Sequence, residues 1–97
     1  MRVIAKRTLR EFWDRYPDAE TPLVEWFRHM ERASYSSPQE LKAVLHKASI
    51  LKAGRAVFNV GGNKYRLVAS IDYDRQLVYV KFVGTHAEYD AIDAESV

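Results

Sequence analysis

The chain has 97 residues, no cysteine and a formal net charge of +2. This length predicts a single domain over residues 1–97 with one modest core, so a functional site is expected on the surface or in a shallow groove. The lack of cysteine excludes disulfide and thiolate chemistry. No apolar run approaches the roughly 18 residues of a membrane span, and no signal-peptide pattern opens the chain. We therefore expect a small soluble cytoplasmic protein that does not contact membranes.

The first part of the chain predicts a short strand and then a helix. Residues 2–5 suit a strand, and residues 6–16 place apolar side chains at helical spacing. Thr8 and Glu11 have the spacing of a capping box, which predicts a helix start nearby. Pro17 ends this helix, because the residue before a proline disfavours helical backbone angles.

Two further helices are expected next. Thr21 and Pro22 are typical of a helix start, as N-cap and first helical residue. Ser37 is the expected cap of a short helix over residues 38–44. We expect the apolar stripes of the first two helices, with both tryptophans, to face the core. The stripe of the second helix consists of Leu23, Trp26, Phe27 and Met30.

The second half of the chain predicts an antiparallel meander. Its apolar residues alternate with polar ones, and glycine, asparagine and aspartate separate the runs. Strands are expected at residues 57–60, 64–72 and 76–83, turns at residues 61–63 and 73–75, and a short final helix at residues 87–94. The order of strand, helices and meander predicts an α+β fold with the helices on one face of the sheet.

Strand alternation assigns the side chains to two faces. The face that the helices should cover carries Tyr65, Leu67, Ala69, Ile71, Val78, Val80 and Phe82. The opposite face should be open and should present Lys64, Arg66, Tyr79 and Lys81. Residues 51–87 hold six lysines and arginines against two aspartates, whereas the last ten residues hold four acids and no cation. This asymmetry indicates an anionic partner for the sheet, although mixed surface charge that maintains solubility explains the charges equally well.

His86 is the strongest candidate for proton transfer. It follows the end of the last expected strand, Tyr89 lies one helical turn later, and Arg66 and Lys81 lie on the neighbouring strands. Histidine changes charge near neutral pH, and arginine holds two phosphate oxygens at once. These groups suit RNA cleavage, in which the substrate's 2′-hydroxyl is the nucleophile. The alternative interpretation is a solvated sheet face.

Neither a metal nor a cofactor is expected. The chain has no cysteine and no H-E-x-x-H motif, and the carboxylates near His86 are dispersed. Gly61 and Gly62 lie between two expected strands, so a hairpin turn explains them better than a phosphate-binding loop. His29 and His46 are expected to have no catalytic role.

Three segments together resemble the HigB toxins of bacterial type II toxin–antitoxin systems, which belong to the RelE-like superfamily. They are residues 2–4 followed by a tryptophan-bearing helix, residues 58–67 (FNVGGNKYRL) and residues 82–90 (FVGTHAEYD). The likeness covers nearly the whole chain. It implies the RelE-like microbial ribonuclease fold, with N-terminal helices packed on one face of an antiparallel β-sheet. It also implies a ribosome-dependent mRNA endoribonuclease that works without metal.

The resemblance implies partners and site residues as well. The expected partners are a HigA-type helix-turn-helix antitoxin, mRNA and the ribosome, with DNA contacted only through the antitoxin complex. By position, Arg66 matches the family's phosphate-stabilising arginine, and His86 and Tyr89 match the region of its C-terminal catalytic residue. Which of His86 and Tyr89 is acid and which is base stays open. The expected RNA-binding residues are Lys52, Arg55, Lys64, Tyr79 and Lys81.

Two other classes of function remain compatible with the sequence. One is a non-catalytic module on the same fold that binds RNA or a protein. The other is a structural interaction protein whose exposed sheet docks an antitoxin. The modest net charge predicts weak binding of free RNA, so we expect the ribosome to orient the substrate.

Overall fold

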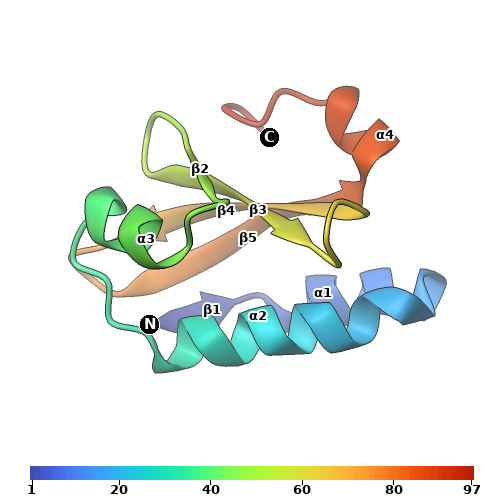
Figure 1. Cartoon of the computed structure of the whole chain (residues 1–97), viewed down its shortest axis with the longest axis horizontal. Coiled ribbons are helices and arrows are strands. Elements are labelled where there is room, and N and C mark those ends of the chain that lie inside the picture. The colour runs from blue at the N-terminus through green and yellow to red at the C-terminus, as the bar shows by residue number, and fades with distance from the viewer.

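A five-stranded β-sheet lies at the centre of the molecule, in a computed structural model that describes residues 1–97. The strand order is β1-β5-β4-β3-β2. Figure 1 shows α1 and α2 below one face of the sheet and α4 on the other side. The elements are β1 (Arg2–Ile4), α1 (Lys6–Arg15), the 3-10 helix η1 (Pro17–Ala19), α2 (Glu20–Arg32), α3 (Pro38–Val44), β2 (Ser49–Ile50), β3 (Arg55–Val60), β4 (Tyr65–Asp72), β5 (Leu77–Thr85) and α4 (His86–Asp90).

Strands β3, β4 and β5 form the expected antiparallel meander, β2 pairs with β3 at one edge, and β1 joins β5 as a parallel edge strand. Gly61 and Gly62 form the β3–β4 turn with φ angles of +63° and +69°, which glycine adopts without steric cost. Strand β2 is two residues long and was not predicted. None of the helices combines the length and apolar character needed to cross a lipid bilayer.

The helices α1 and α2 bury apolar side chains against the sheet. Leu9 and Phe12 of α1 and Leu23 and Met30 of α2 are almost completely buried. Each such side chain contributes about 1.5–3 kcal/mol through removal from water. The predicted stripes are therefore confirmed, except that Trp13, Tyr16 and Phe27 are only partly buried.

A β-bulge in β5 changes which side chains face the helices. The pairing of β4 with β5 skips Lys81. Beyond Lys81 the alternation inverts, so Val83 packs against the core and Phe82, opposite Val68, turns to the other face. The prediction that Phe82 faces the helices is wrong, because one inserted residue moves all later side chains to the opposite face.

The predicted start of α1 at Lys6 is confirmed, but the capping residues expected for α1 and α2 are wrong. Helix α2 begins at Glu20, directly after η1, so Thr21 is already helical and is not the N-cap. Helix α1 begins at Lys6 without a side-chain cap, so Thr8 and Glu11 form no capping box. The 3-10 helix η1 leads directly into α2, whereas at the start of α1 the extended Ala5 accepts a hydrogen bond from the backbone N–H of Thr8 through its carbonyl oxygen at 3.2 Å.

The predictions for the two remaining helices, α3 and α4, are closer to the structure. Helix α3 and its cap are confirmed, because Oγ of Ser37 accepts a hydrogen bond from the backbone N–H of Glu40 at 3.2 Å. The final helix, expected over residues 87–94, is α4 and ends at Asp90. The residues beyond α4 follow an irregular path with two turns.

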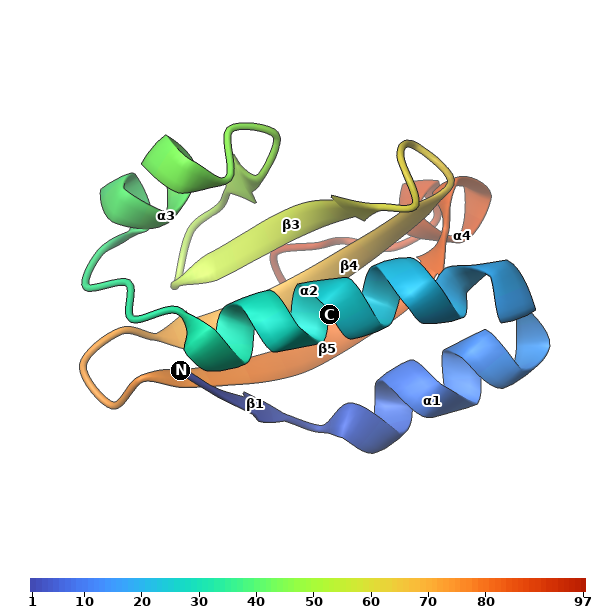
Figure 2. The same cartoon turned by 60° about the horizontal axis from the view of Figure 1, so that its bottom comes forward.

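The end of the chain covers part of the second face of the sheet. Residues 91–97 run from α4 back over the middle of the sheet (Figures 1 and 2). The guanidinium group of Arg55 donates to the carbonyl oxygens of Ala94, at 3.3 Å, and Val97. Val57 and Val68 point to this face and are buried. The prediction of a fully open second face is therefore wrong, because Val57 and Val68 are buried on that face and residues 91–97 run across it.

Candidate functional site

Arg66 and His86 meet where β4 lies beside the end of β5. Arg66 pairs with Gly84 across the two strands, and His86 is the first residue of α4. Nη2 of Arg66 lies 2.7 Å from Nε2 of His86. A guanidinium group only donates hydrogen bonds, so Nε2 of His86 accepts and the ring proton is on Nδ1. The pair therefore places a fixed cation beside a neutral imidazole.

Asp90 extends this pair at the other ring nitrogen. Its Oδ2 lies 3.5 Å from Nδ1 of His86, one helical turn along α4. The Nδ1–H group thus points towards a carboxylate. The side chains of His86 and Asp90 are 51% and 67% exposed, so a substrate can reach them. The predicted catalytic residues did not include Asp90, although the i, i+4 spacing within a helix that begins at residue 86 is enough to find it.

The local sequence fixes where His86 emerges from the sheet. Thr85 and Glu88 form a capping box: Oγ1 of Thr85 accepts from the N–H of Glu88 at 3.1 Å, and Oε1 of Glu88 accepts from the N–H of Thr85 at 2.8 Å. A Cβ atom at Gly84 would lie 2.5 Å from Cζ of Phe82. Glycine therefore allows the Phe82 ring to lie against the backbone beside Arg66.

Backbone carbonyl groups hold the other side of the Arg66 guanidinium. Nη1 of Arg66 donates to the carbonyl oxygens of Asn63 and Tyr65, each at 3.4 Å. Asn59 pairs with Arg66 on β3 and is exposed on the same face. Asn59 and Phe82 are site neighbours that the sequence prediction missed. Strand register alone would have found Asn59, whereas the bulge hid Phe82.

The other predicted residues of β5 and α4 lie near this site without joining its hydrogen bonds. Tyr89 is half-buried on α4, one turn after His86, and its hydroxyl group bonds to no other residue. Tyr79 pairs with Ser70 on the same face as Arg66 and is exposed. Nζ of Lys81 lies 5.9 Å from the centre of the Tyr79 ring, within the range of a cation–π interaction.

Three of the predicted RNA-binding residues do not join the site at Arg66 and His86. Arg55 holds residues 91–97. Lys52 is exposed between β2 and β3. Lys64 is paired with Asp18 of η1, which also accepts a hydrogen bond from the hydroxyl of Tyr65. The prediction that Lys64 presents its charge on the second face is therefore wrong, because a carboxylate on the helix side holds it.

Asp18 is the carboxylate whose protonation the fold affects most clearly. The hydrogen bonds from Lys64 and Tyr65 hold the pKa of Asp18 below its usual range. The same contacts raise the pKa values of Lys64 and Tyr65. No group of three or more histidine, aspartate or glutamate side chains is placed to hold a metal ion.

A family model described as HigB toxin, RelE-like toxic component of a toxin-antitoxin system, matches residues 19–92. The chain belongs to the HigB toxin family. This membership confirms the predicted family and, with the helices packed on a mainly antiparallel sheet, the predicted RelE-like fold class. As the toxic component of such a system, a HigB toxin has an antitoxin partner.

Curated HigB relatives are similar over nearly the whole chain. The mRNA interferase toxin HigB of Escherichia coli strain K12 is 34% identical over 96 residues, which are 97% of this chain and 92% of that protein. The mRNA interferase HigB of Shigella flexneri has the same identity and coverage. The mRNA interferase HigB of Escherichia coli O6:H1 is 29% identical over 94 residues, 95% of this chain and 91% of that protein.

Proposed function

We propose that this HigB toxin is a ribosome-dependent mRNA endoribonuclease whose reacting groups are centred on Arg66 and His86. Membership of a toxin family and relatives named mRNA interferases support this proposal. The observation that carries it is the 2.7 Å contact between the guanidinium group of Arg66 and Nε2 of an exposed histidine. Such a contact brings together a phosphate-binding cation and a proton acceptor, which metal-free RNA cleavage requires.

His86 acts as the base in this mechanism. When the scissile phosphate binds the guanidinium group of Arg66, the Nε2 lone pair is released from Arg66 and takes the proton of the 2′-hydroxyl. The 2′-oxygen forms a bond to phosphorus, and the bond from phosphorus to the 5′-oxygen breaks, which leaves a 2′,3′-cyclic phosphate and a 5′-hydroxyl end. Asp90 stabilises the imidazolium through Nδ1–H.

Arg66 and Tyr89 have complementary roles. Arg66 binds the phosphate oxygens, whose negative charge rises as the phosphorane forms. Tyr89, one turn beyond His86, is the candidate donor of the proton that the departing 5′-oxygen needs. This assignment makes His86 the base, because its Nε2 presents a lone pair, and Tyr89 the acid.

The face beside the pair holds the RNA. Tyr79 and Phe82 offer aromatic surfaces on which bases stack, and Lys81 offers a positive charge to a phosphate. With Arg55 and Lys64 engaged within the protein, few free cations remain there. The ribosome therefore supplies much of the substrate's orientation, so the toxin acts in the cytoplasm on mRNA that is being translated.

A HigA-type helix-turn-helix antitoxin neutralises the toxin in this proposal. The family description supplies the toxin–antitoxin context. Contact with operator DNA is made by the antitoxin and reaches the toxin only through their complex. No metal or cofactor takes part, because the RNA provides the nucleophile.

The proposal is tested by induced expression with mapping of mRNA 5′-ends. We expect wild type to arrest growth and to produce in-frame cuts within translated messages. His86→Ala and Arg66→Ala should lose about 10² to 10⁴ in cleavage rate, because each loses a group that acts in the transition state. His46→Ala is the matched control, since His46 is an exposed histidine before β2 that lies outside the site.

Each departure from this result has a distinct meaning. Arrest and cuts that persist in both variants would overturn the assignment of Arg66 and His86. Loss in Arg66→Ala alone would keep the nuclease and move the base to Tyr89. Soluble wild-type protein that neither arrests growth nor cuts mRNA would favour a non-catalytic binding module on the same fold.

A further inference from the structure

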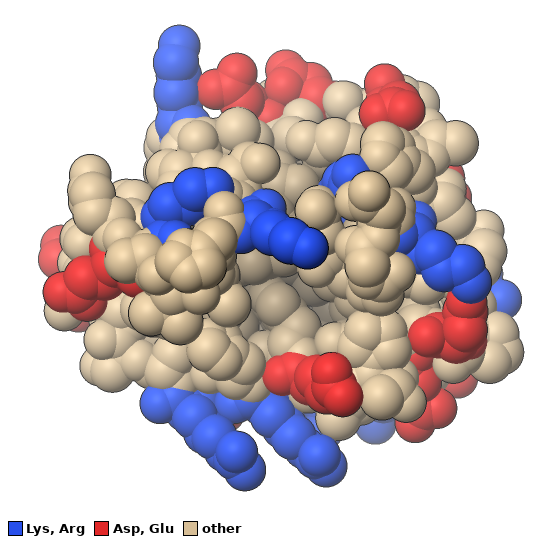
Figure 3. Space-filling model, in the orientation of Figure 1, with Lys and Arg blue, Asp and Glu red and all other residues tan.

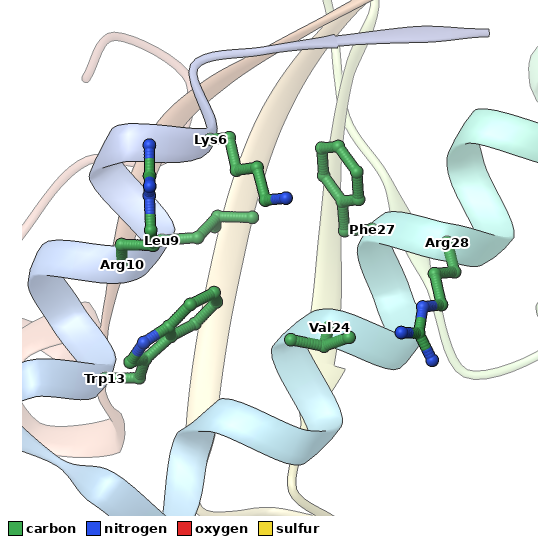
Figure 4. Close-up of a pocket in the computed structure, with 7 residues that line it drawn as sticks. All are labelled: Lys6, Leu9, Arg10, Trp13, Val24, Phe27 and Arg28. Atoms are coloured by element: carbon green, nitrogen blue, oxygen red, sulfur yellow. The ribbon is translucent and has the colours of Figure 1, made fainter.

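The outer sides of α1 and α2 form an apolar groove that no other part of the chain fills. The two helices lie side by side in front of the sheet (Figure 2). Leu9 and Trp13 of α1 and Val24 and Phe27 of α2 line the space between them (Figure 4). The groove, which we call the helix groove, has a volume of about 280 Å³.

Three cations border the helix groove without carboxylate partners. Lys6, Arg10 and Arg28 line it, and no aspartate or glutamate does. The ion pairs of the molecule involve other lysines and arginines. Nζ of Lys6 lies 4.8 Å from the centre of the Phe27 ring. Figure 3 shows cationic side chains projecting below the molecule, on the side of α1 and α2.

This combination is typical of a protein-binding surface. Aromatic residues and arginine are enriched at the centres of interfaces, and an amphipathic helix binds a groove by placing its apolar side chains between two helices. A volume of about 280 Å³ accommodates a few inserted apolar side chains. RNA phosphates also attract cations, but they gain nothing from the apolar walls.

We propose that the helix groove binds an acidic amphipathic helix of the antitoxin. Apolar side chains of that helix enter between Trp13 and Phe27, and its carboxylates face Lys6, Arg10 and Arg28. This inference rests on the proposed function for the identity of the occupant. The groove lies on the helix layer, away from the second face of the sheet that carries Arg66, so the antitoxin is held without needing to touch the reacting groups.

Titration of the purified toxin with the antitoxin of its own operon tests this inference. The double variant Arg10→Glu/Arg28→Glu should lower the association rate constant at least about tenfold and remove most of its salt dependence. The matched control is Arg32→Glu/Lys47→Glu, which changes the net charge equally at exposed cations that do not line the groove. The control should change the dissociation constant less than about threefold.

A second pair of variants tests the apolar walls. Val24→Asp places a carboxylate inside the groove and should weaken binding about 30-fold or more. Val44→Asp is the matched control, because Val44 is exposed on α3 and does not line the groove. Circular dichroism and urea unfolding confirm that each variant is folded. Antitoxin affinity that stays at the wild-type value in both groove variants would overturn the proposal.

The binding experiment separates this inference from the proposed function. It requires no cleavage, so a toxin that fails to cut mRNA still reports on the groove. Groove variants that cut mRNA like wild type but escape the antitoxin support both proposals. Groove variants that lose cleavage while the antitoxin binds normally would assign the cations to the ribosome or RNA and overturn the inference.

Discussion

Asp18 shows how a single exposed side chain links distant parts of this fold. Its carboxylate accepts hydrogen bonds from Lys64 and from the hydroxyl of Tyr65, which lie 46 and 47 positions further along the chain. The contact joins η1 to the start of β4. It also positions the β3–β4 turn, whose carbonyl groups hold Arg66.

Replacement of Asp18 should change how stability depends on pH. Because the pKa of Asp18 is lowered in the folded state, its contribution to the free energy of unfolding is present above the unfolded value of about 3.9 and is lost as pH falls through the folded value. Asp18→Asn should therefore be less stable than wild type near pH 6, and the difference should shrink towards pH 3.

Urea unfolding at both pH values measures this effect. Glu25→Gln is the control, because Glu25 is exposed and forms no ion pair. A difference between wild type and Asp18→Asn that is the same at pH 6 and pH 3 would contradict the predicted role of the carboxylate. The hydroxyl of Tyr65 has the opposite pH dependence. Because its pKa is raised in the folded state, its contribution to the free energy of unfolding is lost as pH rises through the folded value.

Among the elements, α4 is the shortest α-helix and carries the candidate base. It has five residues and no buried side chain, so packing contributes little to its position. The capping box between Thr85 and Glu88 and the strand that precedes it hold the helix in place. The position of His86 relative to Arg66 therefore depends on a small number of hydrogen bonds.

Removal of the cap should lower activity more than stability. Thr85→Ala loses the hydroxyl acceptor, and loss of an N-cap costs about 0.5–2 kcal/mol of helix stability. We expect the mRNA cleavage rate to fall about 10- to 100-fold, because a small displacement of His86 misaligns the base. The free energy of unfolding of the whole protein should fall by no more than this amount. Thr85→Ser keeps the hydroxyl and should retain most of the activity, whereas full activity in Thr85→Ala would refute this role.

For the whole molecule, the layer between the helices and the sheet supplies most of the stability. Leu67 lies in the middle of β4, pairs with Phe58 and Val83 across the neighbouring strands, and is completely buried. The second face has a smaller cover, formed by residues 91–97 through Arg55. The two faces therefore contribute unequally to stability: helices pack against one, and the other is left partly accessible.

Truncation of Leu67 should destabilise the protein strongly. Leu67→Ala removes buried methyl groups and leaves a cavity, which typically costs about 2–5 kcal/mol in the free energy of unfolding. Val44→Ala is the control, because Val44 is 56% exposed and its truncation should change the free energy of unfolding by less than about 0.5 kcal/mol. Chemical unfolding measures both. A loss below about 1 kcal/mol for Leu67→Ala would contradict the central position of this residue.

The sequence by itself determined the features that depend on local periodicity and turn chemistry. The stripes of α1 and α2, the alternation in β4, the glycine turn and the capped α3 were all predicted from residues near one another in the chain. The family resemblance was also carried by continuous motifs, and the family comparison confirms it. These features are readable because helix and strand geometry repeat every few residues.

Only the tertiary structure decided which distant groups meet. It placed Arg66 against His86, tied Lys64 to Asp18, laid residues 91–97 on Arg55 and formed the helix groove. The bulge at Lys81 lies in one strand, yet it is visible only in the register with its neighbour. Such contacts depend on how strands and helices are arranged in space, and residue spacing along the chain does not contain that arrangement.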